Sequence, residues 1–465
     1  MANRQQRDFT RGSIPEHLIM FSLPMFAGSL LQAMYSIVNS IWVGRFMGTE
    51  ALGAVSLSFP LIMALLSLVM GLTMASTTLV AQFRGAGNEP MVKRTVATSL
   101  VLLGVLGAAL SLIGFVFRGP LIALVSPPPE LKQMATDYFG IYMVGMIFMF
   151  LYNVLTAILR GLGDAKTPLT FLVVSTIINI ILDPVLILGM GPVPKLGIAG
   201  AAVATIFSQA VASVLLWRWV KRNTDLLPQA RAEWQVDWSV IQSVLKIGMP
   251  SGIQQALVSF GMVAVTAIIS SFGSVVIAAY GAASRFDQFG FMPPMAIGMA
   301  VSSMVGQNLG AGNFDRVKAT VRWACGLTAG ICALIAVIAV LWPTILMVLF
   351  TDDQAVLSEG SRYLQIMGPT YIPFGLIFIL GGVMRGAGDT VPPMFFTVAA
   401  LWVFRVPLAY LLSRSMGSQG IWLGIAISAV IGMLVHWAYY VTGRWRRKVV
   451  AHRVPVPEVQ ISIAE

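Results

Sequence analysis

Twelve apolar stretches follow one another along this chain, and they constrain its fold more than any other feature. About 20 apolar residues cross the hydrocarbon core of a bilayer as a helix, and the stretches reach or exceed that length. They lie at 15–43, 52–80, 94–117, 134–159, 167–190, 197–219, 240–271, 275–305, 319–349, 361–384, 393–413 and 418–442. Because backbone groups in lipid must be paired within their own segment, we predict an all-α polytopic membrane protein with twelve transmembrane helices.

The composition leaves little room for a soluble domain. Of the 465 residues, 57% are hydrophobic and 11% are charged, whereas about 25% are charged in an average soluble domain. The polar residues 1–13 lead directly into a full-length apolar stretch, so we predict no cleaved signal peptide. The net charge of +11 is dispersed among the loops, which favours a membrane protein over a nucleic-acid-binding one.

Lys and Arg residues are distributed unevenly between alternate loops. Most of the 30 fall in the two termini and in the loops that follow the even-numbered stretches. Cytoplasmic loops of membrane proteins carry the excess of Lys and Arg. Both termini are therefore predicted to be cytoplasmic.

Two sequence blocks recur after 225 residues. AQFRGAGN at 81–88 matches GQNLGAGN at 306–313, and RGLGDAKTP at 160–168 matches RGAGDTVPP at 385–393. Each half holds six stretches, so both halves enter the membrane from the same side and the repeats are parallel. The predicted units are an N-terminal lobe at 1–219, a cytoplasmic linker at 220–238, a C-terminal lobe at 239–442 and a basic cytoplasmic tail at 443–465. Transporters with such repeats bind substrate between the halves and alternate access by moving one against the other.

The most informative polar residue is Asp183, in the fifth apolar stretch. Asn179 and Ser175 precede it at intervals of four, which places the three side chains on one helical face. An ionisable group within a membrane span costs about 2.5–3.5 kcal/mol on insertion scales, so such groups usually mark an ion or proton pathway. The second half has Val406 at the matching position. The alternative is structural, because Asp183 precedes Pro184 and could bond the backbone that a proline kink frees.

Other polar or flexible residues within the stretches are candidates for a substrate cleft. Hydroxyl and amide groups would meet the polar parts of a ligand, and methionines suit ligands of several shapes. The alternatives are hydrogen bonds across helix interfaces and ordinary apolar packing. The candidates are Gln32, Tyr35, Ser36, Tyr138, Tyr142, Gln255, Met292 and Met295.

A second polar site is predicted on the eighth stretch, where Arg285 and Asp287 lie near the membrane centre. Residues two apart do not face each other on a helix, so each needs another partner. Arg405 on the eleventh stretch could serve Asp287. A structural ion pair is the alternative to a functional role.

Signatures of catalysis are missing from the sequence. The three histidines are scattered and neither a P-loop nor a GxSxG motif is present, so we predict no enzyme and no cofactor. A transporter without an ATP site would draw on a gradient of H+ or Na+. Cys325 and Cys332 share one apolar stretch, which indicates packing rather than a disulfide or zinc site.

Five segments together resemble the MATE (multidrug and toxic compound extrusion) family. They are LPMFAGSLLQAMYSIVNSIWVGRFMG at 23–48, AQFRGAGN at 81–88, LRGLGDAKTP at 159–168, NIILDP at 179–184 and LGIAGAAVAT at 196–205. The Arg-x-Asp sequence at 285–287 is most similar to the DinF-like bacterial branch. The resemblance implies a V-shaped pair of lobes in the bacterial plasma (inner) membrane, surrounded by lipid. It also implies export of small amphipathic or cationic organic compounds in exchange for H+ or Na+, and we expect a monomer.

The resemblance further implies a cation site in the N-terminal lobe. Carried onto this chain, that site comprises Asn179, Asp183 and Thr205, with Ala201 offering a backbone carbonyl. Where the family usually has Asp in a VDT-like stretch of the first span, this chain has Asn39, which cannot titrate. One carboxylate can exchange one proton, so H+ is the predicted coupling ion and Na+ the alternative.

Two other classes of function fit a polytopic membrane protein. A flippase for a lipid-linked oligosaccharide or another lipid, from a related transporter superfamily, would need a cationic central cavity. Only Arg285 and Arg405 are available for one. A membrane scaffold that transports nothing would have no use for an acid within the membrane.

Overall fold

The computed structural model describes residues 6–125, 128–190, 194–227 and 234–451, which form helices joined by short turns. Twelve helical segments are long and apolar enough to cross a membrane, so the predicted fold class is confirmed. The elements in chain order are α1 (Ile14–Gly85), α2 (Glu89–Val116), α3 (Arg118–Ala123), α4 (Pro129–Gly161), α5 (Lys166–Leu188), α6 (Ile198–Asn223), α7 (Trp238–Ser270), α8 (Ser274–Gly310), α9 (Phe314–Leu341), α10 (Pro343–Val348), α11 (Gln354–Met367), η2 (Gly368–Thr370), α12 (Tyr371–Ala387), α13 (Val391–Ala399), η3 (Ala400–Arg405), α14 (Val406–Met416), α15 (Ser418–Thr442) and η4 (Arg444–Lys448).

Two helix boundaries differ from the apolar stretches for local reasons. α1 contains two spans, Ile14–Gly48 and Gly53–Gly85, and the helix is interrupted at Gly48, whose φ of +82° favours a residue without a Cβ. The ninth stretch was predicted to run to residue 349, but α9 ends at Leu341 and the separate α10 follows. The break falls at Trp342, because Pro343 disfavours the helical conformation of the residue before it.

The repeated sequence blocks fold alike in the two halves. Gly87 and Gly312, which are 225 residues apart, have φ of +69° and +73°. Gly163 and Gly388 have the same separation and φ of +85° and +80°. These left-handed conformations require glycine at each turn, so the sequence repeat reflects a repeated backbone geometry.

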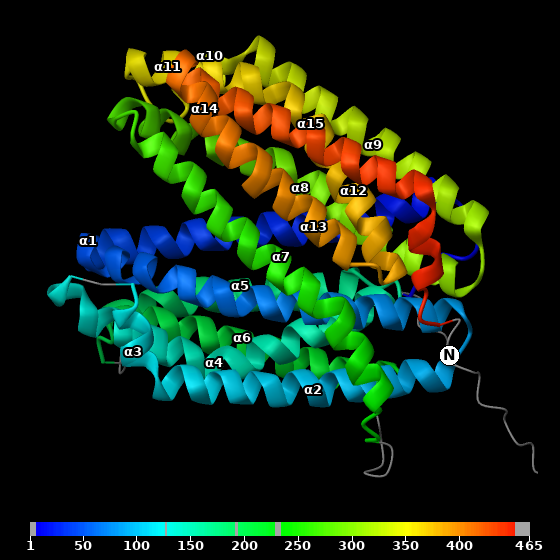
Figure 1. Ribbon diagram of the computed structural model, residues 1–465. Coiled ribbons are helices and arrows are strands. Elements are labelled where there is room, and N and C mark those ends of the chain that lie inside the picture. The colour runs from blue at the N-terminus through cyan, green and yellow to red at the C-terminus, as the bar shows by residue number, and fades with distance from the viewer. Residues whose placement is uncertain (1–5, 126–127, 191–193, 228–233, 452–465) are drawn as a thin grey trace, which may run out of the picture.

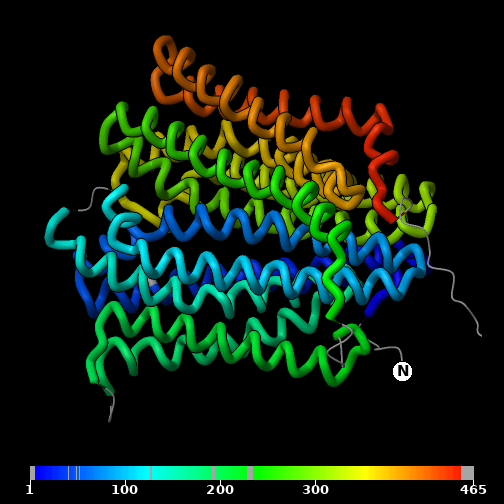
Figure 2. Tube along the Cα trace, turned by 60° about the horizontal axis from the view of Figure 1, so that its bottom comes forward, coloured from blue at the N-terminus to red at the C-terminus, as the bar shows by residue number. Residues whose placement is uncertain are grey.

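The helices form two groups that meet at one end of the molecule. The group α1–α6 and the group α8–α15 converge where the N-terminus lies and spread apart at the end that carries α3, α10 and α11 (Figure 1). Figure 2 shows the same two groups from another side, with α1 lying next to both. The molecule therefore has the V shape that the resemblance implied.

The first helix of each half begins against the opposite half. Phe9, Leu18 and Phe21 share an apolar cluster with residues of α8, α9 and α12. Reciprocally, Val240 and Ile247 of α7 belong to the apolar cluster of α1–α6. The proposed linker and tail are described only in part, because 228–233 and 452–465 lie outside the described residues.

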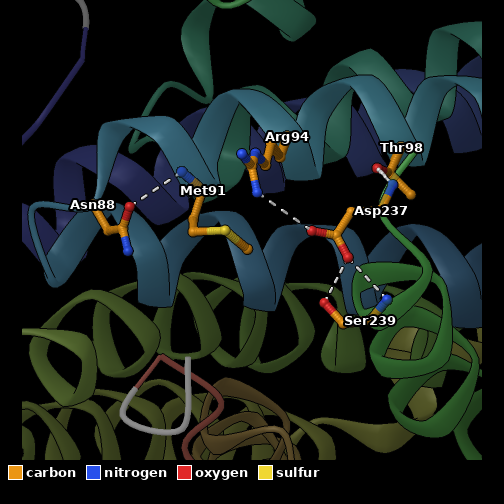
Figure 3. A network of polar contacts seen from close by, with 6 residues as sticks. All are labelled: Asn88, Met91, Arg94, Thr98, Asp237 and Ser239. Atoms are coloured by element: carbon orange, nitrogen blue, oxygen red, sulfur yellow. Dashed lines mark hydrogen bonds and ion pairs between the residues drawn. The ribbon is translucent and has the colours of Figure 1, made fainter. Parts of the chain in front are cut away.

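The start of α7 is held on α2 by Asp237. The Asp237 carboxylate accepts hydrogen bonds from the Ser239 backbone N–H at 2.9 Å and from the Ser239 hydroxyl at 2.6 Å, which caps α7. Its own backbone N–H donates to Thr98 Oγ1 at 3.0 Å, and Arg94 lies 3.9 Å from its carboxylate (Figure 3). One residue thus both begins α7 and attaches it to the first half.

Replacing Asp237 by alanine is expected to lower the stability of the folded protein by about 1 kcal/mol, the usual cost of losing such a cap. Asp237→Asn should cost less, because asparagine caps equally well. The bonds from Ser239 hold the pKa of the Asp237 carboxyl below its usual 3.8, so the stabilisation is present above that value and is lost as the pH falls through the folded-state pKa. Thermal unfolding in detergent measures this, and an Asp237→Ala cost that stays equal in strong acid would contradict it.

Candidate functional site

Asp183 lies on the buried face of α5 with Asn179 and Ser175, as the interval of four predicts. The exposed fractions of Asp183 and Asn179 are 0% and 1%. The amide oxygen of Asn179 accepts from the backbone N–H of Thr205 on α6 at 3.1 Å, and the NH2 group donates to Asp183 Oδ2 at 2.9 Å. This orientation gives each end of the amide a complementary partner. Asn179 therefore joins α6 to the buried carboxylate.

The hydrogen bonds of Asp183 test the alternative that this residue only pairs with backbone groups freed by a kink at Pro184. Within the part of the chain that the structure describes, the Asn179 amide is the hydrogen-bond partner of the carboxylate, and no Lys, Arg or His lies within ion-pair distance. The backbone that Pro184 leaves unpaired receives no bond from it among these residues. The carboxylate is thus buried with a neutral partner.

Tyr35 on α1 extends the group of polar side chains. The Thr205 hydroxyl donates to the backbone carbonyl of Ala201 at 3.0 Å. It has one hydrogen, so its 2.9 Å bond with Tyr35 is donated by the tyrosine. Asn39, one turn after Tyr35, makes a side-chain contact with the Tyr35 hydroxyl. The residues that the resemblance assigned to the site are therefore linked in space.

Two tyrosines of α4 complete this side of the site. The rings of Tyr138 and Tyr142 lie 6.3 Å apart, and both side chains are near the Tyr35 hydroxyl. Tyr138 is also close enough to Asp183 for the two groups to interact electrostatically. These tyrosines were predicted for a substrate cleft, and that role stays a prediction; of the two, Tyr138 lies within electrostatic range of the carboxylate.

The other cleft candidates differ in how far they are exposed. Gln32 and Ser36 have exposed side chains on α1, as do Gln255 on α7 and Met295 on α8. Met292 was predicted to offer its side chain to ligands, but it is only 7% exposed and packs inside the second half. Met295, three residues later on the same helix, is exposed, so the two methionines differ in burial.

A second buried acid, Asp287, lies in the other half. Tyr371 donates to Asp287 Oδ1 at 2.6 Å, and Tyr363 donates to Oδ2. The Tyr363 ring in turn packs edge-to-face on Trp422 and on Tyr280. The carboxylate is therefore satisfied by two hydroxyls from α11 and α12.

The prediction that Arg405 pairs with Asp287 is wrong for this structure. Arg405 Nε donates to Ser428 Oγ at 2.9 Å, and its guanidinium lies 5.1 Å from the centre of the Phe374 ring. No ion pair links it to Asp287 among the described residues. Arg285 is exposed on α8, facing away from the buried acid, as residues two apart on a helix must.

Tyr363 and Tyr371 were not predicted as site residues from the sequence. They flank Gly368–Thr370, where the helix tightens into a single 3₁₀ turn between α11 and α12. An inventory of hydroxyl donors within the apolar stretches would have included both. Their common partner depends on how α11 and α12 pack against α8, which no local pattern reveals.

Comparison with known proteins decides the family. The sequence model described as MatE matches residues 24–185 and 250–411. The probable multidrug resistance protein YpnP of Bacillus subtilis is 33% identical over 439 residues, which cover 94% of this chain and 97% of YpnP. The chain belongs to the MatE family. YoeA of the same organism, also a probable multidrug resistance protein, is 33% identical to this MatE chain over 444 residues. An FAD transporter of Shewanella oneidensis is 27% identical over 89% of this chain and 91% of its own length.

Solved structures show that the fold is shared as well. A MATE protein in the straight conformation superimposes with a TM-score of 0.87 at 24% identity, covering 96% of this chain and 99% of that one. A MOP superfamily transporter of Pyrococcus furiosus gives 0.86 at 23% identity, covering 97% and 100%. The twelve spans and the bacterial relatives identify this MatE chain as a multi-pass membrane protein.

The MatE model matches twice, once in each half, and the two matches begin at Pro24 and Pro250. Asp183 and Asn179 fall within the first match, and Asp287 and Arg405 fall within the second. Asp183 and Asp287 of this MatE protein therefore lie in different copies of the repeat.

Proposed function

We propose that this MatE protein is a secondary active transporter that exports amphipathic or cationic organic compounds in exchange for H+. Two relatives that align over 94% of the chain are named probable multidrug resistance proteins, which supports export of drugs. The moving units would be the two halves, 1–219 and 239–442, which bind the compound between them and open alternately to either side.

The observation that carries this proposal is the burial of Asp183 with a neutral partner. A charged carboxylate without a counter-ion is costly in such surroundings, so the site is stable when it holds a proton or a cation. In the proposed cycle Asp183 is deprotonated while substrate occupies the inward-facing cleft. Protonation from outside then rearranges the first half and expels the substrate.

The donor set around Asp183 favours H+ over Na+. Hard cations bind through oxygen atoms, but Asn179 presents its NH2 group to the carboxylate, because its oxygen is engaged by Thr205. The Ala201 carbonyl already accepts from the Thr205 hydroxyl. Na+ would retain one carboxylate oxygen and the hydroxyls, and would require the amide to turn.

Dye efflux from drug-sensitive cells that express the protein tests the proposal. We expect efflux that stops when an uncoupler dissipates the proton gradient and continues when sodium is removed. Efflux that stops only on sodium removal would contradict H+ coupling. Retention of every cationic dye at the level of cells without the protein would contradict drug export.

Orientation and surroundings form part of the same proposal. The excess of Lys and Arg on the loops that share a side with the termini supports cytoplasmic termini, in the plasma membrane of a bacterium. We expect the protein to act as a monomer. A lipid flippase is the alternative, and the burial of Arg405 against Phe374 and Ser428 weakens it, because that cation is not free to line a cavity.

A further inference from the structure

We propose that Gln82 and Gln307 form a latch that holds the two halves together at the end where the N-terminus lies, and that the transport cycle opens this latch. The two glutamines lie on the last turns of α1 and α8, in the repeated blocks AQFRGAGN and GQNLGAGN. Their exposed fractions are 0% and 1%. Each side chain is therefore enclosed within the protein.

Gln82 uses both ends of its amide to bind the opposite half. Its Nε2 donates to the backbone carbonyl of Gly386, at the end of α12, at 2.9 Å. Its Oε1 accepts from the backbone N–H groups of Val450 at 2.8 Å and of Ala451 at 3.4 Å. A residue of the first half thus binds both a helix end of the second half and the C-terminal segment that follows that half.

Gln307 repeats this arrangement in the other direction. Its Nε2 donates to the backbone carbonyl of Gly161, at the end of α4, at 2.9 Å. Its Oε1 accepts from the backbone N–H of Phe9 at 3.0 Å. The acceptors Gly161 and Gly386 are 225 residues apart, as the two glutamines are, so the latch follows the symmetry of the repeat.

The backbones of α1 and α8 are in direct contact around the latch. A Cβ atom at Gly85 would lie 1.8 Å from the carbonyl oxygen of Gln307, and one at Gly310 would lie 1.9 Å from that of Gln82. Because the backbones of α1 and α8 come this close, the side-chain amide of each glutamine reaches the opposite half. The side chains and the two glycines act as one unit.

The chemistry of glutamine explains why the latch can be opened. A buried amide that loses its partners pays the cost of leaving both a donor and an acceptor unpaired. When the halves separate at this end, water replaces those partners, so the closed state is favoured without being irreversible. Gln82 and Gln307 are positioning residues in this scheme, since they act on the relative placement of the halves.

Spin-label distances test the latch directly. The inference rests on the proposed movement of the two halves, but the measurement needs neither a substrate nor an ion gradient. One label pair replaces the exposed Lys93 and Lys318 at the closed end, and a second replaces Leu124 and Leu349, each 75% exposed, at the spread end. Both are made in a Cys325→Ser, Cys332→Ser background.

For Gln82→Ala combined with Gln307→Ala, the Lys93–Lys318 distance is expected to lengthen and the Leu124–Leu349 distance to shorten. The ratio of open to closed molecules at the latch end should rise about tenfold, as the loss of several hydrogen bonds predicts. The control is Gln254→Ala, because Gln254 bonds Thr397 within its own half. It should leave both distances unchanged.

Unchanged distances in the double variant would overturn the proposal. So would broadening at both ends without opposite shifts, since that indicates only a structural role. If the alanine variant does not fold, Gln82→Met with Gln307→Met keeps the side-chain shape without the bonds, and the same criteria apply. Failure of the latch proposal would appear in the spin-label distances, whereas failure of the proposed drug export would appear in the separate dye-efflux assay. The two failures can therefore be distinguished.

Discussion

Asp183→Asn is expected to abolish proton-driven export while leaving the protein folded in the membrane. Asparagine has nearly the same shape and can still accept the hydrogen bond from the Asn179 NH2 group, so packing between α5 and α6 is retained. It cannot release or take up a proton. Reconstituted into liposomes with an imposed pH gradient, the variant should transport no faster than protein-free liposomes.

Asp137→Asn provides the matched control, because Asp137 is exposed on α4 and its carboxylate bonds Gln133. That variant should retain transport and its dependence on pH. Undiminished proton-driven export by Asp183→Asn would eliminate Asp183 as the coupling group. If substrate movement down its own concentration gradient persists in Asp183→Asn, the loss lies in coupling rather than in substrate binding.

Gly85→Ala and Gly310→Ala are expected to reduce transport by about tenfold or more, because each prevents closure of the end where the N-terminus lies. The added Cβ meets backbone carbonyl oxygen in each case. Backbone of a packed helix cannot move aside as the tip of a flexible side chain can. The helices must separate instead, which leaves the transporter open at that end. Transport by reconstituted protein measures the loss.

Gly104→Ala in α2 and Gly330→Ala in α9 are the controls for this substitution, since nothing lies within 4 Å of a Cβ at either position. They should transport at the rate of the unmodified protein. Full activity of Gly85→Ala and Gly310→Ala would mean that close contact of α1 and α8 is not needed in the cycle. The prediction would then be wrong, whatever the coupling ion.

Helix positions could be predicted because lipid imposes one simple rule. A span must be apolar and about 20 residues long, and that rule locates all twelve. It does not locate local breaks, so Trp342 was expected inside a span and lies between α9 and α10. The turn glycines were visible as a repeat, because a left-handed backbone position leaves a signature in the residue type itself.

From the spacing of residues alone, the site was predictable only along a single helix. The interval of four placed Ser175, Asn179 and Asp183 on one face of α5, and all three are buried there. That Tyr35 binds Thr205, and that Asp287 is served by Tyr363 rather than by Arg405, depends on which helices are neighbours. Tyr363 and Asp287 are 76 positions apart in the sequence. Contacts between residues so far apart produce no periodic pattern from which they could be predicted.

The sequence by itself determined the membrane location, the number of spans, the twofold repeat and the unrepeated buried acid, because burial in lipid and backbone conformation each restrict residue type locally. Only the tertiary structure decided how the halves meet. The glutamines of two similar motifs look like ordinary turn-flanking residues in the sequence. They form a latch between the halves because the backbones of α1 and α8 approach so closely that each side-chain amide reaches the other half.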